Sequence, residues 1–77
     1  MGTNEALCKY LEDETGLHVS IKKINSSFIT LEFRNEVTNE YVMEFFLWRE
    51  TVRKKNFVYI YSAVLYKLNT QTDYGRK

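Results

Sequence analysis

The residues of this sequence that could take part in catalysis are few, and their spacing does not bring them together. Cys8 is the only cysteine and His18 the only histidine, so neither has a second thiol or imidazole with which to form a metal site. Glu12, Asp13 and Glu14 are consecutive, and adjacent carboxylates on a helix point in different directions rather than toward one substrate. We therefore expect an inert thiol, a surface histidine and a solvated helix end, and we predict no enzyme activity, no metal and no cofactor.

A second group of candidate residues is basic. Arg53, Lys54 and Lys55 form a run of cations ahead of an apolar segment. Lysines beside a helix N-terminus are suited to phosphate binding, because the helix dipole and the free amides there also favour an anion. The alternative is a solvated turn that binds nothing. The whole chain carries 11 basic and 10 acidic residues, a net charge of +1, which is less positive than nucleic-acid-binding domains usually are.

The third group is aromatic and lies in the stretch EYVMEFFLWRE, residues 40–50. Successive side chains of a strand alternate between the two faces of a sheet, and a core needs only one apolar face. Interface hot spots are enriched in Trp and Arg, so we predict that Phe46, Trp48 and Arg49 bind a protein partner. Val42 would extend this patch, and Arg49 would orient a carboxylate of the partner. Alternatively, a fourth strand or the C-terminal tail covers these side chains as core.

Hydrophobic periodicity predicts the elements that position these residues. Residues 3–16 are typical of a helix that Thr3 or Asn4 caps and that ends at Gly16 in a left-handed conformation. Its buried stripe would consist of Leu7, Tyr10 and Leu11. Three segments then show the alternation of half-buried strands: residues 17–24, 28–34 and 41–48. Short loops join them, which predicts an antiparallel meander.

The segment from Thr51 to Asn69 is ambiguous between strand and helix. Its β-branched and aromatic residues favour a strand, but its apolar side chains also recur at helical spacing. These are Phe57, Ile60, Tyr61, Val64, Leu65 and Leu68. A strand of this length would exceed the usual length of about 5–6 residues, so we predict a helix with Thr51 as its cap. Residues 70–77 are expected to fray.

Together these elements predict an α+β fold of two layers in the order α-β-β-β-α. Two helices would cover one face of a three-stranded antiparallel meander sheet and leave the other face open. The open face is expected to carry His18, Ser20, Lys22, Phe28, Thr30, Glu32, Val42, Glu44, Phe46 and Trp48. We expect a single domain over residues 1–77, with an ordered core over residues 3–69 and no membrane span. The lone thiol is typical of a reducing compartment, so we expect an intracellular protein.

Part of the sequence resembles a known family. Residues 9–35, KYLEDETGLHVSIKKINSSFITLEFRN, resemble the start of the RWD-like globular head in the spindle-pole-component subunits of the outer-kinetochore microtubule-attachment complex. In that family a short helix leads into a "GL-x-I-x-K" strand and then a "FxF-x-N" strand, which residues 16–19 and 31–35 match in part. Residues 52–68, VRKKNFVYIYSAVLYKL, are similar to the closing helix of these heads. The long stretch that precedes that helix in the family is nearly absent here.

The resemblance implies a non-catalytic head at the kinetochore in the nucleus. Heads of this family follow a long coiled coil, pair with a similar subunit and dock a receptor peptide. No binding residue of the family can be carried over to a numbered position of this chain.

Double-stranded-RNA-binding domains share the order α-β-β-β-α and are similar in length. In them a Lys-rich turn before the closing helix contacts phosphates, and Arg53, Lys54 and Lys55 stand at the matching place. The turn at residues 25–27 lacks the Gly-Pro-x-His-type loop of that family, and the first helix is acidic. The sequence therefore predicts an adaptor domain that binds a protein partner, with RNA binding as the second hypothesis and homodimerisation as a third.

Overall fold

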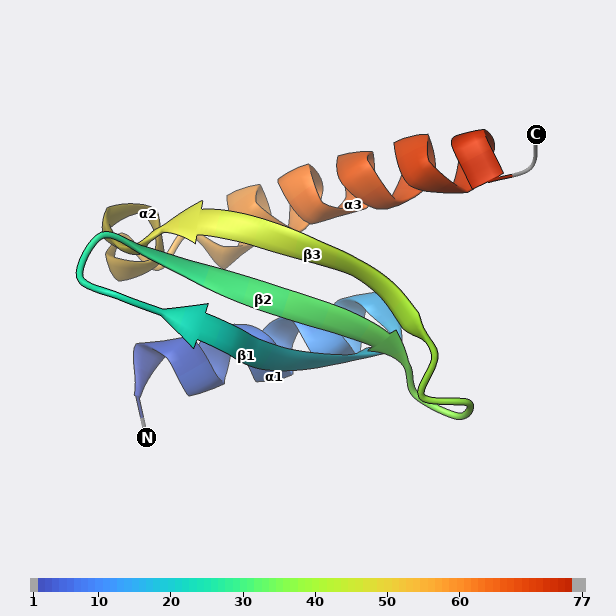
Figure 1. Cartoon of the computed structure of the whole chain (residues 1–77). Helices are drawn as coiled ribbons and strands as arrows, with labels where there is room; N and C mark the ends of the chain where they lie inside the picture. The colour runs from blue at the N-terminus through green and yellow to red at the C-terminus, as the bar shows by residue number, and fades with distance from the viewer. Residues whose placement is uncertain (1, 76–77) are drawn as a thin grey trace.

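The computed structural model describes the backbone of residues 2–75 and the side chains of residues 2–70. Its elements are α1 (Thr3–Thr15), β1 (Leu17–Ile24), β2 (Phe28–Asn35), β3 (Tyr41–Trp48), α2 (Arg49–Arg53) and α3 (Phe57–Gly75). The strands form one antiparallel sheet in the order β1-β2-β3. Figure 1 shows the helices on one side of this sheet and the other side open. The α+β fold expected from the sequence is confirmed, with the short helix α2 in addition.

The N-terminal cap of helix α1 lies one residue before the first of the two predicted caps. Gly2, not Thr3 or Asn4, is the N-terminal cap residue, and the capping prediction was wrong. The backbone N–H of Gly2 donates to Oε1 of Glu5 at 3.4 Å. This is one of the two hydrogen bonds of a capping box, which stabilises the first turn of many helices. At the other end Gly16 has φ 75, as predicted, and its N–H donates to the carbonyl of Glu12 at 2.9 Å. This left-handed residue turns the chain directly into β1.

The core lies between the sheet and the three helices. Its buried side chains are Leu7, Leu11, Val19, Ile29, Leu31, Phe33, Met43, Leu47, Val52, Ile60 and Val64. Tyr10 is only partly buried, and its ring lies 5.7 Å from that of Phe57 and 6.4 Å from that of Tyr61. These ring contacts join the first and last helices of the chain, because aromatic pairs at such separations attract each other.

The connection from β3 to the last helix differs from the prediction. A single helix over Thr51–Asn69 with Thr51 as cap was wrong, because the chain forms α2, turns, and begins α3 at Phe57. Lys55 adopts φ 59, a left-handed conformation that interrupts a right-handed helix. The side-chain oxygen of Asn56 accepts the N–H of Tyr59 at 3.2 Å and so caps α3 in place of Thr51.

The break lets both helices reach the core, since Val52 of α2 and Ile60 of α3 are both buried. Helix α3 continues to Gly75, past the predicted end at Asn69. The expected fraying of residues 70–77 stays a prediction, and residues 76 and 77 lie outside the described residues.

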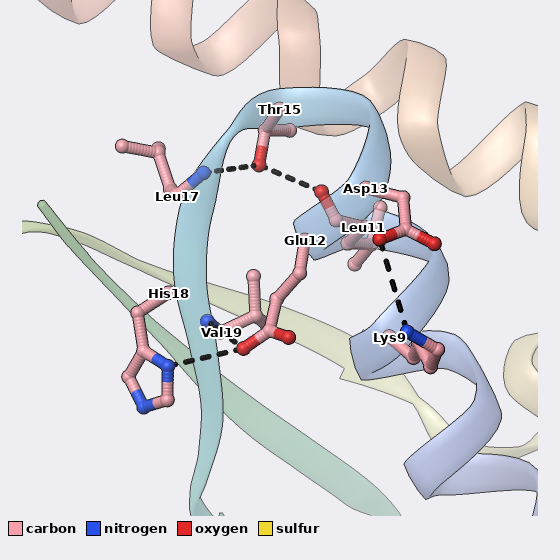
Figure 2. Close-up of polar contacts among 8 residues, drawn as sticks. All are labelled: Lys9, Leu11, Glu12, Asp13, Thr15, Leu17, His18 and Val19. Atoms are coloured by element: carbon pink, nitrogen blue, oxygen red, sulfur yellow. Dashed lines mark hydrogen bonds and ion pairs between the residues drawn. The ribbon is translucent and has the colours of Figure 1, made fainter. Parts of the chain in front are cut away.

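Side chains from the helices occupy the outer edges of the sheet. In Figure 2 the carboxylate of Glu12 on α1 accepts the N–H of Val19 on β1, at 3.0 Å. On the opposite edge, Nζ of Lys67 on α3 donates to the carbonyl of Glu44 on β3, at 2.7 Å. Unpaired groups on edge strands invite pairing with another chain. At these two points a helix side chain takes the place of a further strand.

The contact between Glu12 and β1 predicts a cost for removing the carboxylate. Glu12→Ala leaves the N–H of Val19 without this acceptor, and we expect it to lower the free energy of unfolding by about 1–2 kcal/mol. Urea titration followed by far-UV circular dichroism measures this change. Glu14→Ala is the matched control, because Glu14 is exposed on the same turn of α1 and its loss should cost less than about 0.5 kcal/mol. Equal effects of the two substitutions would contradict the role given to Glu12.

Candidate protein-interaction site on the open sheet face

Three aromatic side chains gather at one end of the open sheet face. The antiparallel register sets Phe28 of β2 opposite Trp48 of β3. The ring of Phe28 stacks on that of Phe46, with centroids 5.8 Å apart and planes 8° apart. Trp48 meets Phe28 edge-on, at 6.4 Å and 86°. We call Phe28, Phe46 and Trp48 the aromatic cluster.

The aromatic cluster is held in place yet open to solvent. Phe46 and Trp48 are each 66% exposed, so no strand and no part of the C-terminal tail that the structure describes covers them as core. Phe28 is half-buried between them. Thr30, which lies opposite Phe46 in the register, is only 3% exposed although it is on the open face. The sheet therefore presents large apolar rings above a well-packed base.

A hollow of about 220 Å³ lies at the aromatic cluster and is lined by its members and Leu47. Pockets for small-molecule ligands and cofactors usually measure about 300–1,000 Å³. The hollow is therefore better matched to one bulky apolar side chain of a partner than to a cofactor. Phe46 also lines a second hollow, of about 380 Å³, together with Tyr41 and Lys67 at the outer side of β3.

The charged side chains of the open face are paired with one another. Lys22 of β1 forms an ion pair with Glu44 of β3, and Arg34 lies 2.9 Å from Glu32. The hydrogen bond to Glu44, with the attraction of its charge, raises the pKa of Lys22. A raised pKa of a lysine means that the pairing is complete at neutral pH and is lost only as the pH rises through that value. These pairs leave the aromatic cluster as the apolar part of the face.

Two of the predicted binding residues are already engaged in the fold. Val42 is half-buried and packs against the core. The guanidinium of Arg49 donates through Nη1 to the carbonyl of Asn25 at 3.0 Å, and the backbone N–H of Arg49 donates to Ser27 at 2.9 Å. Arg49 therefore ties the β1–β2 turn to the start of α2.

Phe28 joins Phe46 and Trp48 at this site, whereas the binding roles of Val42 and Arg49 stay predictions. Phe28 was assigned to the open face but not to the binding site. The signal that could have found it is the pairing of β2 with β3. Once residues 28 and 48 are set opposite each other, the outward side chain at the start of β2 must lie against the outward side chain at the end of β3.

The basic run lies at a different place in the fold. Arg53 ends α2, and Lys54 and Lys55 form the turn before α3; all three are exposed. The amides that open α3 are partly occupied, because Asn56 accepts the N–H groups of Tyr59 through its side chain and of Ile60 through its carbonyl. A phosphate at this N-terminus would have fewer free donors than the sequence suggested.

The candidate catalytic residues do not converge on a reaction site. Glu12 is more than a solvated helix end, since its carboxylate accepts the N–H of Val19 and lies 3.1 Å from Nδ1 of His18 (Figure 2). Asp13 lies 4.0 Å from Lys9 on the exposed side of α1. Within the described residues, no hydrogen bond joins His18 to a hydroxyl or thiol that could serve as nucleophile. The Glu12–His18 pair therefore fastens α1 to β1.

Two further searches covered the described part of the chain. It contains no group of three or more His, Cys, Asp or Glu side chains that could hold a metal ion. None of its helices is both long enough and apolar enough to cross a membrane.

Comparison of this chain with protein-family models, curated proteins and solved structures found no match. The function is therefore argued from the geometry of the site and from the residues themselves.

Cys8 is predicted to be unreactive at neutral pH. It is half-buried, and burial, with smaller contributions from Glu12 and Glu5, raises the pKa of its thiol from 9.0 to about 11. The higher pKa lowers the fraction of Cys8 present as thiolate at neutral pH about 100-fold. A more basic thiolate is also more nucleophilic, which offsets part of this loss. We therefore expect alkylation of the folded protein to be about 10-fold slower than that of the unfolded chain. The measurement is the rate of iodoacetamide labelling in buffer and in urea, with Cys8→Ser as the blank.

The pH dependence of that rate is a second readout. The rate for the folded protein should keep rising with pH to about 11, whereas the rate for the unfolded chain should level off near 9.0. Because the folded protein retains its proton longer, stability should fall as the pH rises through this interval. Equal labelling rates in buffer and urea would show that Cys8 is an ordinary exposed thiol.

The exposure of Trp48 predicts its fluorescence. As the only tryptophan, it should emit near the wavelength of the unfolded chain and be readily quenched by acrylamide, because its ring is in contact with water. The measurement is made at low protein concentration, with the mass checked by light scattering. A blue-shifted, protected emission from a monomer would contradict the open position of Trp48.

Proposed function

We propose that this chain is a non-catalytic protein-interaction domain that binds a partner protein through the aromatic cluster. The observation that carries the proposal is the exposure of Phe46 and Trp48 on a sheet face without helices. Interface hot spots are enriched in aromatic residues that are packed by their neighbours before binding. The contacts of Phe28 with both rings provide such packing, so little side-chain entropy would be lost on association.

The size of the aromatic cluster sets the strength of binding that it can supply. With aromatic side chains of roughly 150–250 Å² each, two thirds exposed, Phe46 and Trp48 offer on the order of 250 Å². At about 25 cal/mol per Å² this area is worth about 6 kcal/mol, against an association cost of about 4–15 kcal/mol. The cluster alone therefore supports a weak contact. A stable complex needs the partner to cover more of the open face as well.

The resemblance of residues 9–35 to kinetochore heads supports a more specific form of the proposal. In that form the partner is a related α/β head, and the two heads pair as the spindle-pole-component subunits do. The helix and strands at residues 3–35 have the order that this family shows at its start. The paired charges of Lys22 and Glu44 suit such a partner, since they leave few charges unpaired under a covering protein surface.

RNA binding remains the second proposal, supported by the exposure of Arg53, Lys54 and Lys55 beside the start of α3. Against it stand the near-neutral net charge of the chain and the capping of α3 by Asn56. The two proposals differ in salt dependence. Affinity for RNA falls steeply with salt because counterions are released, whereas an aromatic contact is much less sensitive.

The test uses a displayed library of random peptides selected against the domain, followed by titration of the selected peptides. We expect these peptides to carry a bulky apolar residue. Phe46→Ala and Trp48→Ala should each weaken binding about 30-fold, the size of a hot-spot contribution. Trp48→Ala should change the free energy of unfolding by less than about 1 kcal/mol, since it removes only surface contacts. Tyr41→Ala is the matched control, because Tyr41 is an exposed aromatic of the same strand.

Three outcomes would count against the proposal. If Trp48→Ala unfolds the domain, Trp48 is a structural residue. If Tyr41→Ala weakens peptide binding as much as Trp48→Ala does, the site is not confined to the aromatic cluster. The second proposal would be favoured if no peptide is selected and the domain binds a double-stranded RNA oligonucleotide. The double substitution Lys54→Ala with Lys55→Ala should then abolish RNA binding.

A further inference from the structure

The solvent side of α3 carries a second exposed apolar surface. Val58 is 64% exposed, Tyr59 62%, Leu65 37% and Tyr66 75%. Ser62, between them in the sequence, is also exposed. We call these five residues the outer face of α3. The opposite side of the helix is the one that reaches the core, through side chains such as Ile60 and Val64.

The outer face of α3 lacks charge. Residues 56–66 contain no charged side chain, in a chain of which 27% is charged; Lys55 and Lys67 flank this stretch. Helices at the surface of a domain usually place charged and polar residues on the solvent side. A helix segment that is apolar on both sides is typical of one that is covered on both sides. The core covers one side of residues 57–66, and nothing in the described part of the chain covers the outer side.

The spacing of the residues on the outer face suits packing against another helix. At 100° per residue, Ser62 lies at the centre of the face, with Val58 and Leu65 on one flank. Tyr59 and Tyr66, seven residues apart, form the other flank. Ser62 has a small side chain between two flanks of larger ones, and helices pack by fitting the side-chain ridges of one between those of the other.

We propose that the outer face of α3 is a self-association surface, on which a second copy of this chain docks its own α3 in antiparallel orientation. A two-fold axis near Ser62 would set Tyr59 of one copy against Tyr66 of the other. A two-fold contact requires a surface that complements itself. An uncharged face meets this requirement, since no like charges are brought together, and each tyrosine ring has the small side chain of Ser62 beside it.

The charges beside the outer face decide the orientation. Arg53, Lys54 and Lys55 lie just before the N-terminus of α3 and are exposed. A parallel pair would bring two of these basic runs together and would also align the positive ends of the two helix dipoles. An antiparallel pair separates the runs and places each toward the C-terminal half of the other helix, where the dipole favours cations.

The area available sets the strength of the dimer. From typical side-chain surfaces of roughly 150–250 Å² for each tyrosine, the exposed parts of the outer face total on the order of 400 Å² per copy. Two copies would bury on the order of 800 Å², below the approximately 1,200 Å² of stable specific interfaces. The dimer is therefore a weak one, which forms as the protein concentration rises.

This surface is separate from the aromatic cluster. Figure 1 shows α3 on the helix side of the sheet, whereas Phe46 and Trp48 lie on the open side. Self-association through α3 does not depend on the proposed function and leaves the aromatic cluster free. A dimer of this kind would present two aromatic clusters on its outside and so bind partners bivalently.

The first test is sedimentation equilibrium of the full chain from roughly 10 µM to 1 mM, where weak dimers populate. We expect the mass to rise toward that of two chains. Tyr66→Glu should weaken the dimer at least about 10-fold, because the contact would bury an unpaired charge. Tyr41→Glu is the matched control, as it adds the same charge to an exposed tyrosine outside the outer face. Far-UV circular dichroism confirms that both variants fold.

The second test examines the geometry without removing an apolar side chain. Ser62→Cys in a Cys8→Ser background should form a disulfide between two copies under mild oxidation, since the axis brings the two positions together. Thr38→Cys, in the exposed β2–β3 turn, should not. Tyr59→Cys should cross-link poorly in an antiparallel pair but well in a parallel one.

Each possible result bears on the proposal. A chain that stays monomeric over the whole concentration range overturns it. The proposal is also overturned if Trp48→Ala abolishes the dimer and Tyr66→Glu leaves it intact, because the contact would then use the aromatic cluster. Cross-linking through Tyr59→Cys rather than Ser62→Cys would overturn the antiparallel arrangement.

Discussion

Burial of the central strand on one side only is the constraint on which the structure depends. Ile29, Leu31 and Phe33 of β2 are fully buried against the helices, and the neighbouring strands and both long helices are arranged around them. In the described residues no further layer packs on the other face of the sheet, so a single face meets the demand for a core. Apolar side chains on the other face are then surplus to folding, which is why Phe46 and Trp48 are informative about function and Phe33 is not.

Helix side chains also bind the two edges of the sheet. At the β1 edge a carboxylate accepts a backbone N–H, and at the β3 edge an ammonium group donates to a backbone carbonyl. Glu12 and Lys67 thereby match the polarity of the backbone groups that they meet. Since extended chains pair readily with free edges, these contacts direct association away from strand addition. What stays available is side-chain surface, on the open face of the sheet and on the outer face of α3.

Local patterns predicted most of the fold, and the failures have a common cause. Strands β1 and β3 match their predicted bounds because alternation is a property of the strand itself, and Gly16 matches because only glycine favours its backbone angles. The break before α3 was missed because no glycine or proline marks it; Lys55 takes a left-handed conformation that the packing of Val52 and Ile60 requires. The contacts of Arg49 and Glu12 within the fold were missed for a similar reason. Their partners, Asn25 and Val19, are set by the tertiary structure, whereas the position of Trp48 followed from the pattern of one strand.

The contact of Tyr10 with Phe57 and Tyr61 has a consequence for how the chain reaches this structure. Each strand pairs with its neighbour in the sequence, so the sheet can grow through hairpins that close short loops at little entropic cost. The rings of α1 and α3, in contrast, meet only after about fifty residues of intervening chain have been ordered, a long-range closure that slows folding. The rate at which this protein folds should therefore be governed by the docking of its two ends, while the meander between them forms early.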